Sequence, residues 1–140
     1  MVPWCRKHDT GVIVYSPMHA GLLTGAFSAE RVASLPDDDW RKSDDDFTKN
    51  LDANLTVAAA MAKVAERHGV TTAAAAAAWT IAWPGVSGAI VGARSAEQVD
   101  GWLDAATLEY DAADMQIVAD AIAAFGAGEG PVGPRDLSPG

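Results

Sequence analysis

Two short stretches rich in β-branched residues stand out along the chain: residues 12–15 (VIVY), which are all apolar, and residues 86–91 (VSGAIV), which are interrupted by a serine and a glycine. The first is followed by Ser16 and Pro17, and the second by Gly92. Strands that are buried on both faces of a parallel sheet have this continuous apolar pattern, whereas half-exposed strands alternate. The pattern therefore predicts two short buried strands in a parallel sheet.

Between these runs, apolar residues recur at helical spacing. Over residues 50–68 the positions on one face are Leu51, Leu55, Ala58, Met61, Ala62 and Ala65. Gly69 follows as a helix stop, and Thr71 or Thr72 can cap a second helix that contains six consecutive alanines and must end by Pro84. We expect a helix pair, the second member of which is thin enough to pack closely against its neighbours.

Two further helices follow the second strand. Ser95 and Gln98 have the spacing of a capping box, which predicts a helix from Ser95 to about Asp104. Asp111 can cap a last helix that ends at Gly126. Its apolar stripe consists of Met115, Val118, Ile122 and Phe125.

The order of these elements is typical of a parallel α/β fold, but two strands cannot close a barrel or form a complete open sheet. We therefore expect residues 1–125 to be part of a larger α/β domain. Residues 16–47, with six aspartates between positions 36 and 46, are expected to form a long connection with little regular structure. Residues 126–140 contain five glycines and three prolines and are expected to be a disordered tail.

The charge and the composition of the chain argue against several classes of binding partner. The formal charge of −9 argues against nucleic-acid binding, and no apolar run approaches the roughly 20 residues of a membrane span. Cys5 is the one cysteine and the three histidines are scattered, so neither a disulfide scaffold nor a metal site is expected. These features predict a cytoplasmic protein with no membrane or nucleic-acid partner. His68 is interpreted as a partner of a helix dipole or an exposed side chain.

Chemistry in parallel α/β folds lies where the strands end, which directs attention to the segments after Tyr15 and Val91. Arg94 and the helix start at Ser95 can attract a phosphate, and this arrangement indicates a nucleotide. The alternative is that Arg94 is a solvated turn residue and Ser95 only a cap. Tyr15, likewise, is either a stacking surface for a flat ring or a core residue.

Three segments together resemble the C-terminal part of an aldo-keto reductase. They are residues 11–25 (GVIVYSPMHAGLLTG), the alanine-rich helix that ends near Trp79, and residues 89–98 (AIVGARSAEQ). The resemblance covers about residues 4–125. It implies the last two strands of a TIM (β/α)8 barrel with their helices, incomplete as a barrel, in a family that reduces carbonyl compounds with NADPH.

The resemblance also implies roles for particular residues. Tyr15 is similar to the aromatic residue on which the nicotinamide stacks. The loop that folds across the cofactor pyrophosphate is matched by Ser16, Pro17, Met18, His19 and Ala20. The adenosine 2′-phosphate site is matched by Gly92, Arg94, Ser95 and Gln98.

The sequence departs from the family pattern at three places. Gly101 and Trp102 stand where members commonly have a Glu-Asn pair that contacts the adenine, although Trp102 offers a stacking face. Ala26 stands where many members have a lysine, which leaves Arg31 as the nearest cation. Nothing in the chain matches the catalytic Asp, Tyr, Lys and His of the family, and Tyr110 has no tuning Lys or His beside it in the sequence.

Three hypotheses follow. The first is the cofactor-side segment of an NADPH-dependent reductase of aldehydes or ketones, inactive alone and completed by a missing N-terminal half. The second is a non-catalytic nucleotide-binding remnant. The third is a helical interaction module that associates through exposed sheet edges.

Overall fold

The structure of the chain is a computed structural model that describes residues 1–128 and 130–133. The α-helices are Val2–Lys7 (α1), Ala29–Ala33 (α2), Leu51–His68 (α3), Thr72–Ile81 (α4), Ala96–Asp100 (α5) and Ala112–Phe125 (α6). The strands are Ile13–Tyr15 (β1) and Gly88–Ile90 (β2). Short 3-10 helices span His19–Thr24 (η1), Trp40–Lys42 (η2), Asp45–Phe47 (η3) and Leu103–Ala106 (η4).

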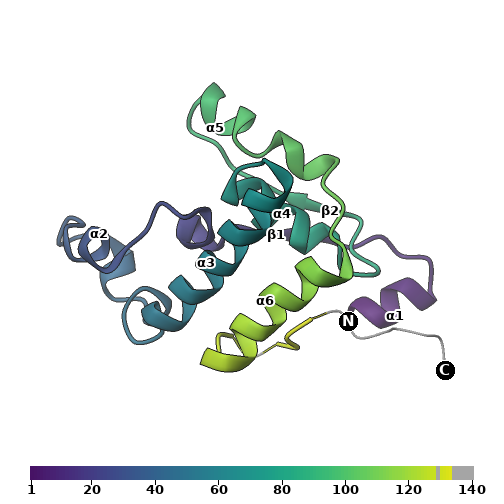
Figure 1. The fold of residues 1–140 in the computed structure, drawn as a ribbon, viewed down its shortest axis with the longest axis horizontal. Helices are drawn as coiled ribbons and strands as arrows, with labels where there is room; N and C mark the ends of the chain where they lie inside the picture. The colour runs from purple at the N-terminus through teal and green to yellow at the C-terminus, as the bar shows by residue number, and fades with distance from the viewer. Residues whose placement is uncertain (129, 134–140) are drawn as a thin grey trace.

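The two strands pair in parallel, as the sequence predicts, with Ile13 opposite Gly88 and Tyr15 opposite Ile90. Figure 1 shows the strands beside α4, and contacts between α4 and β2 agree with this view. Parallel strands run in the same direction, so both carboxyl ends lie at one edge of the sheet. The segments that follow Tyr15 and Ile90 are therefore brought together although they are far apart in the sequence.

The prediction that both strands are buried is wrong for this chain. Ile13, Tyr15 and Ile90 are 69%, 81% and 61% exposed. In a parallel barrel or a doubly covered sheet, neighbouring strands and inner side chains cover such positions. Among the described residues the sheet has two strands only, so these side chains have no further layer to pack against.

The principal core lies between α3, α4 and α6, with Met61, Val64 and Val118 almost completely buried. Figure 1 shows α6 beside α3, and contacts between the two helices agree with this view. The alanine-rich helix packs closely, as expected, because positions 74–78 are all buried. Two predicted core positions are wrong: Ala62 and Phe125 are exposed.

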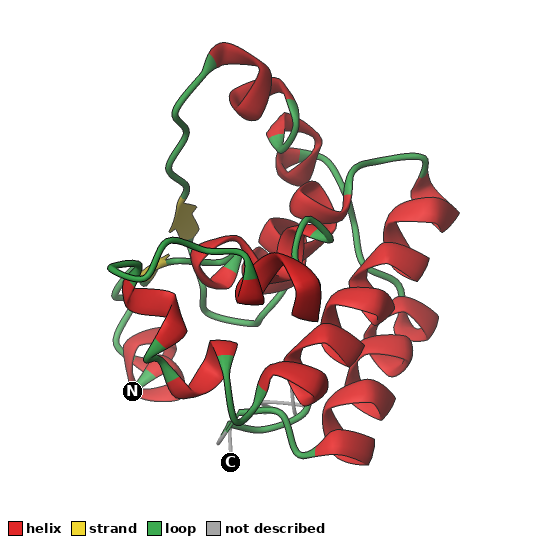
Figure 2. Ribbon diagram, turned by 90° about the vertical axis from the view of Figure 1, so that its left-hand side faces the viewer, coloured by secondary structure: helices red, strands yellow, loops and turns green. Residues whose placement is uncertain are grey.

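Residues 16–47 are more ordered than the sequence predicts. They form four short helices around a second core of Leu22, Val32, Phe47 and Leu51. The aspartates are a reason for this order, because Asp39 and Asp44 accept hydrogen bonds from backbone N–H groups and cap η2 and η3. Figure 2 shows the chain alternating between short helices and turns in this part of the molecule.

The helix after Ser95 is shorter than predicted. It ends at Asp100, and Gly101 separates it from η4. Residues 126–128 and 130–133, the described part of the predicted tail, contain no helix or strand. Residues 129 and 134–140, for which a disordered tail is expected, lie outside the described residues.

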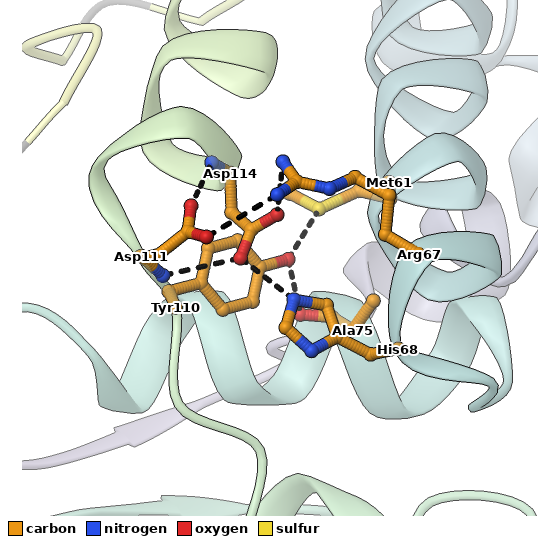
Figure 3. Close-up of polar contacts among 7 residues, drawn as sticks. All are labelled: Met61, Arg67, His68, Ala75, Tyr110, Asp111 and Asp114. Atoms are coloured by element: carbon orange, nitrogen blue, oxygen red, sulfur yellow. Dashed lines mark hydrogen bonds and ion pairs between the residues drawn. The ribbon is translucent and has the colours of Figure 1, made fainter.

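A buried carboxylate joins the two longest helices. Asp114 of α6 is completely buried, accepts a hydrogen bond from the backbone N–H of Asp111 at 3.1 Å and forms a reciprocal capping box with that residue. It also pairs with His68 at 2.7 Å and Arg67 at 2.9 Å, both at the end of α3 (Figure 3). His68 is an exposed residue, as the sequence interpretation allows, and the structure adds that its ring pairs with the buried carboxylate of Asp114.

Substitution of Asp114 tests this link. We expect Asp114→Ala to lower the free energy of unfolding by about 3 kcal/mol, because the buried pair and one half of the capping box are lost together. Urea unfolding followed by circular dichroism measures the change. Asp120→Ala on the exposed side of the same helix is the matched control and should change stability by less than about 0.5 kcal/mol. Equal effects of the two substitutions would contradict the assignment.

Candidate functional site

A cleft of about 830 Å³ opens at the carboxyl ends of β1 and β2. Its volume lies within the range of small-molecule and cofactor sites in proteins. The cleft brings together eight of the residues that the sequence singles out: Tyr15, Ser16, Pro17, Met18, Ala20, Gly92, Arg94 and Gln98. Two separate segments of the sequence thus form one surface.

His19 and Ser95 do not line this cleft. The His19 ring pairs with Asp46 at 2.8 Å and stacks on Phe47, on the side of η3. Desolvation raises the pKa of Asp46, but hydrogen bonds from Asn50 and His19 outweigh it, so the pKa lies below its ordinary value. The Ser95 hydroxyl instead accepts the backbone N–H of Gln98 and acts as a helix cap.

The loop after β1 has an unusual backbone. Ser16, His19 and Ala20 have φ values of 56°, 48° and 53°, in the left-handed region that residues with a Cβ rarely adopt. Such strain persists only where surrounding contacts hold it, and it concentrates at functional sites. Pro17, which is buried, anchors this loop against the fold. The loop is therefore held in a defined shape along the cleft.

The turn after β2 is fixed by a side chain of its own helix. The Gln98 side-chain oxygen accepts the backbone N–H of Arg94 at 2.7 Å. Because α5 has only five residues, its dipole is smaller than that of the longer helix expected from the sequence. The guanidinium of Arg94 is consequently the stronger attraction for an anion at this turn.

Two more arginines line the cleft from the opposite segment. Arg31 and Arg41 lie 4.9 Å and 5.5 Å from the centre of the Phe27 ring. Arg41 forms a paired contact with the Asp39 carboxylate, at 2.8 Å and 2.5 Å, and this contact lowers the pKa of Asp39 to about 2. The sequence points to Arg31 as a cation, but not to Arg41, which stands in an acidic stretch.

Three guanidinium groups thus border one cleft in a chain of net charge −9. The positive charge of Arg94 also contributes to the lowered pKa of Asp39, although the two residues are far apart in the sequence. No aspartate or glutamate is among the residues that line the cleft. Because Arg41 is paired with Asp39, the positive charge that favours an anionic ligand such as a phosphate ester comes mainly from Arg31 and Arg94.

A tyrosine, a histidine and an aspartate also gather away from the cleft, between α3, α4 and α6 (Figure 3). Tyr110 donates its hydroxyl hydrogen to the carbonyl of Ala75 at 2.9 Å. Burial, followed by the nearby Asp114 charge, raises the pKa of Tyr110 above its ordinary value. A tyrosine that donates a proton in catalysis needs the opposite shift. Tyr110 therefore contributes to the core and does not replace a missing acid.

The similarity of this chain to known proteins agrees with the geometry of the site. The sequence model of the Aldo/keto reductase family matches residues 1–123. Uncharacterized oxidoreductases of Mycobacterium bovis and Mycobacterium tuberculosis are each 33% identical over 125 residues, covering 89% of this chain and 38% of the relative. The structure of a glycerol dehydrogenase from Gluconobacter oxydans matches all of this chain and 40% of its own, with a TM-score of 0.79 and 29% identity.

The chain belongs to the aldo/keto reductase family. Its fold is part of a (β/α)8 barrel, with two parallel strands that do not close, which confirms the predicted fold class. The chain spans less than half the length of the relatives that it matches. Members of the family generally bind a nicotinamide cofactor and a carbonyl substrate, and the two mycobacterial relatives are named as oxidoreductases.

Two absences hold for the part of the chain that the structure describes. None of the helices there is both long and apolar enough to cross a membrane. In the same part of the chain, no group of three or more His, Cys, Asp or Glu side chains is arranged to hold a metal ion.

The ionisation of Tyr110 tests its structural role. Because its folded pKa is raised, the neutral hydroxyl stabilises the fold fully below the ordinary tyrosine value of about 10, and this stabilisation is lost as the pH rises through the folded value. In Tyr15→Phe, which leaves Tyr110 as the one tyrosine, phenolate absorbance should appear only above the ordinary range and together with loss of helical circular dichroism. Ionisation near pH 10 with intact helices would show an accessible hydroxyl.

Proposed function

We propose that this chain is the cofactor-side, C-terminal part of an NADPH-dependent aldo/keto reductase that reduces aldehydes or ketones. The observation that carries the proposal is the cleft in which Tyr15 and the loop after it face Arg94 and the turn after β2. A nucleotide cofactor suits this donor set, because Arg31 and Arg94 border the cleft beside the Asp39-paired Arg41 and no acidic side chain lines it.

Each part of the cleft has its own task in this proposal. The Tyr15 ring, 81% exposed, is available for stacking on the nicotinamide. The strained loop formed by residues 16–20 lies along the cofactor pyrophosphate, with His19 directed away toward Asp46 as a support for the loop. Arg94 binds the adenosine 2′-phosphate, and Gln98 fixes the turn that carries Arg94. Ser95 supports the same turn as a cap.

Bound NADPH supplies the hydride for carbonyl reduction, and a separate acid must supply the proton. The described residues offer no suitable acid. Tyr110 is buried with a raised pKa, and Tyr15 belongs to the cofactor side of the cleft. We therefore propose that the acid and its tuning residues come from the remainder of the barrel, which would also cover the exposed sheet. The proposed location of the protein is the cytoplasm.

Two alternative functions are consistent with part of these observations. A non-catalytic nucleotide-binding protein would use the same cleft without the chemistry, and the three arginines support it equally well. A helical interaction module would use the exposed strand residues Ile13 and Ile90 instead. Nucleotide binding separates the third hypothesis from the first two, and recovery of activity with the rest of a barrel separates the first from the second.

Replacement of Arg94 tests the choice of cofactor. A hydrogen bond to a charged group is worth roughly 1.5 to 3 kcal/mol, so Arg94→Ala should weaken NADPH binding by about 10- to 150-fold and leave NADH binding nearly unchanged. Fluorescence titration of both cofactors, on the chain co-expressed with the complementary barrel segment of a relative, measures the effect. Ser95→Ala should cost less, because its hydroxyl serves the helix start.

Lys63→Ala, an exposed position on α3 outside the cleft, is the control for a lost positive charge. If Arg94→Ala weakens NADPH and NADH equally, the residue supports the turn and does not recognise the 2′-phosphate.

The activity of the isolated chain is a separate test. We expect no oxidation of NADPH with aromatic aldehydes above a heat-treated control, because general acid catalysis alone contributes about 10²- to 10⁴-fold. Co-expression with the complementary barrel segment should restore the reaction. Turnover by the chain alone would contradict the proposed division of the site.

A further inference from the structure

A groove runs between α3 and α6, the two helices that the contacts of Asp114 join. Its volume is about 390 Å³. The residues that line it belong to these two helices, and none of them lines the cleft at the strand ends. They are Thr56, Ala59, Ala60 and Lys63 of α3, and Ile117, Asp120, Ala121 and Phe125 of α6. The groove is therefore a surface separate from the candidate site.

The two walls of this groove differ in shape. On the α3 wall, Ala59 is exposed and presents only a methyl group. On the α6 wall, Phe125 is 57% exposed, although it follows Val118 and Ile122 along the apolar stripe of its helix. Aromatic side chains are enriched where proteins associate. One wall thus offers space, and the other offers a ring that can fill it.

The walls also differ in charge. Lys63 is exposed and forms no hydrogen bond or ion pair with the described residues. Asp120 accepts a hydrogen bond from Gln116 at 2.6 Å through one carboxylate oxygen, which leaves the other oxygen for a second donor. The α3 wall therefore carries a positive charge and the α6 wall a negative charge.

The two charges lie at nearly the same height along the groove. His68 at the end of α3 pairs with Asp114 in the first turn of α6, so the helices run antiparallel. Counted from this pair, Lys63 lies five residues back along α3 and Asp120 lies six residues further along α6. Each residue advances a helix by about 1.5 Å, so the two heights differ by only about 1.5 Å. By the same count, Phe125 lies level with the first residue of the α3 wall.

We propose that this groove is a self-complementary interface, at which a second copy of the chain docks about a two-fold axis parallel to the helices. Rotation about this axis sets α3 of one copy against α6 of the other at equal heights. Lys63 then meets Asp120 of the second copy, and the ring of Phe125 covers Thr56 and Ala59 of the second copy. Each contact occurs twice, because the two copies use the same surface. The proposal does not depend on the cofactor assignment.

The proposed interface is small. Eight residues line the groove on each copy, against roughly 20 to 30 a side in a stable complex. Association should therefore be weak and appear only at high protein concentration. At the low concentrations of circular dichroism and cofactor titration the chain is monomeric, so Asp120→Ala and Lys63→Ala serve as controls in those measurements.

Sedimentation velocity at increasing concentrations of the chain tests the proposal. The unaltered chain should pass from monomer to dimer. Phe125→Ala should weaken the dimer by about 30-fold or more, because an aromatic anchor is lost at two places. Ile90→Lys, on the exposed sheet, is the control and should leave the dimer unchanged.

Exchange of the two charges separates a specific contact from a loss of fold. Lys63→Glu and Asp120→Lys should each weaken the dimer by about 2- to 30-fold, because two exposed ion pairs are lost. The two substitutions combined place opposite charges on the facing walls again and should return the affinity nearly to that of the unaltered chain. A misfolded variant would not recover in this way.

Three results would overturn the proposal. They are a chain that stays monomeric up to about 1 mM, a dimer that Ile90→Lys abolishes or Phe125→Ala leaves intact, and charge variants that do not recover when combined. The first result leaves the groove to a different protein, and the second moves the interface to the sheet. A dimer that Phe125→Ala weakens and the combined charge variant retains supports the proposal.

Discussion

Parallel pairing of β1 with β2 is the constraint on which the rest of the structure depends. The paired residues Ile13 and Gly88 are separated by α3 and α4, so the pairing requires the helical crossover that forms the principal core. It also places the loop after Tyr15 and the turn before Ser95 at one edge of the sheet. The cleft and the position of Arg94 beside the loop after β1 follow from that placement.

The pairing leaves a large part of the sheet uncovered. Ile13, Tyr15 and Ile90 have the residue types of barrel strands, yet most of their side-chain surface faces outward. Exposed strand edges favour association with further strands. The same sheet thus accounts for two features: the cleft at its carboxyl edge, and an uncovered surface with which further strands could pair.

Much of this arrangement can be predicted from local sequence patterns. Thr71, Ser95 and Asp111 cap the helices that they were expected to begin, because capping depends on residues within one turn. The exposure of the strands could not be predicted, since the apolar pattern of a barrel strand is the same whether or not its neighbours are present. Arg41 was missed because its position depends on the fold of the acidic stretch around Asp39.

The role of His68 was also hidden in the sequence, because its partner Asp114 lies 46 positions away on another helix. The candidate site was easier to find where family-like motifs and strand ends coincide, as at Tyr15 and Arg94. His19 shows the limit of that approach, because its side chain turns toward Asp46 and does not line the cleft.

Hydrogen–deuterium exchange of the chain with and without NADPH tests the central claim most directly. The account predicts added protection in two separate segments, residues 15–20 and 92–98, with no change in α6, which contributes no residue to the cleft. Protection in both segments together would show that the paired strands form one binding surface. Protection in one segment alone, in α6, or in neither segment would contradict the account.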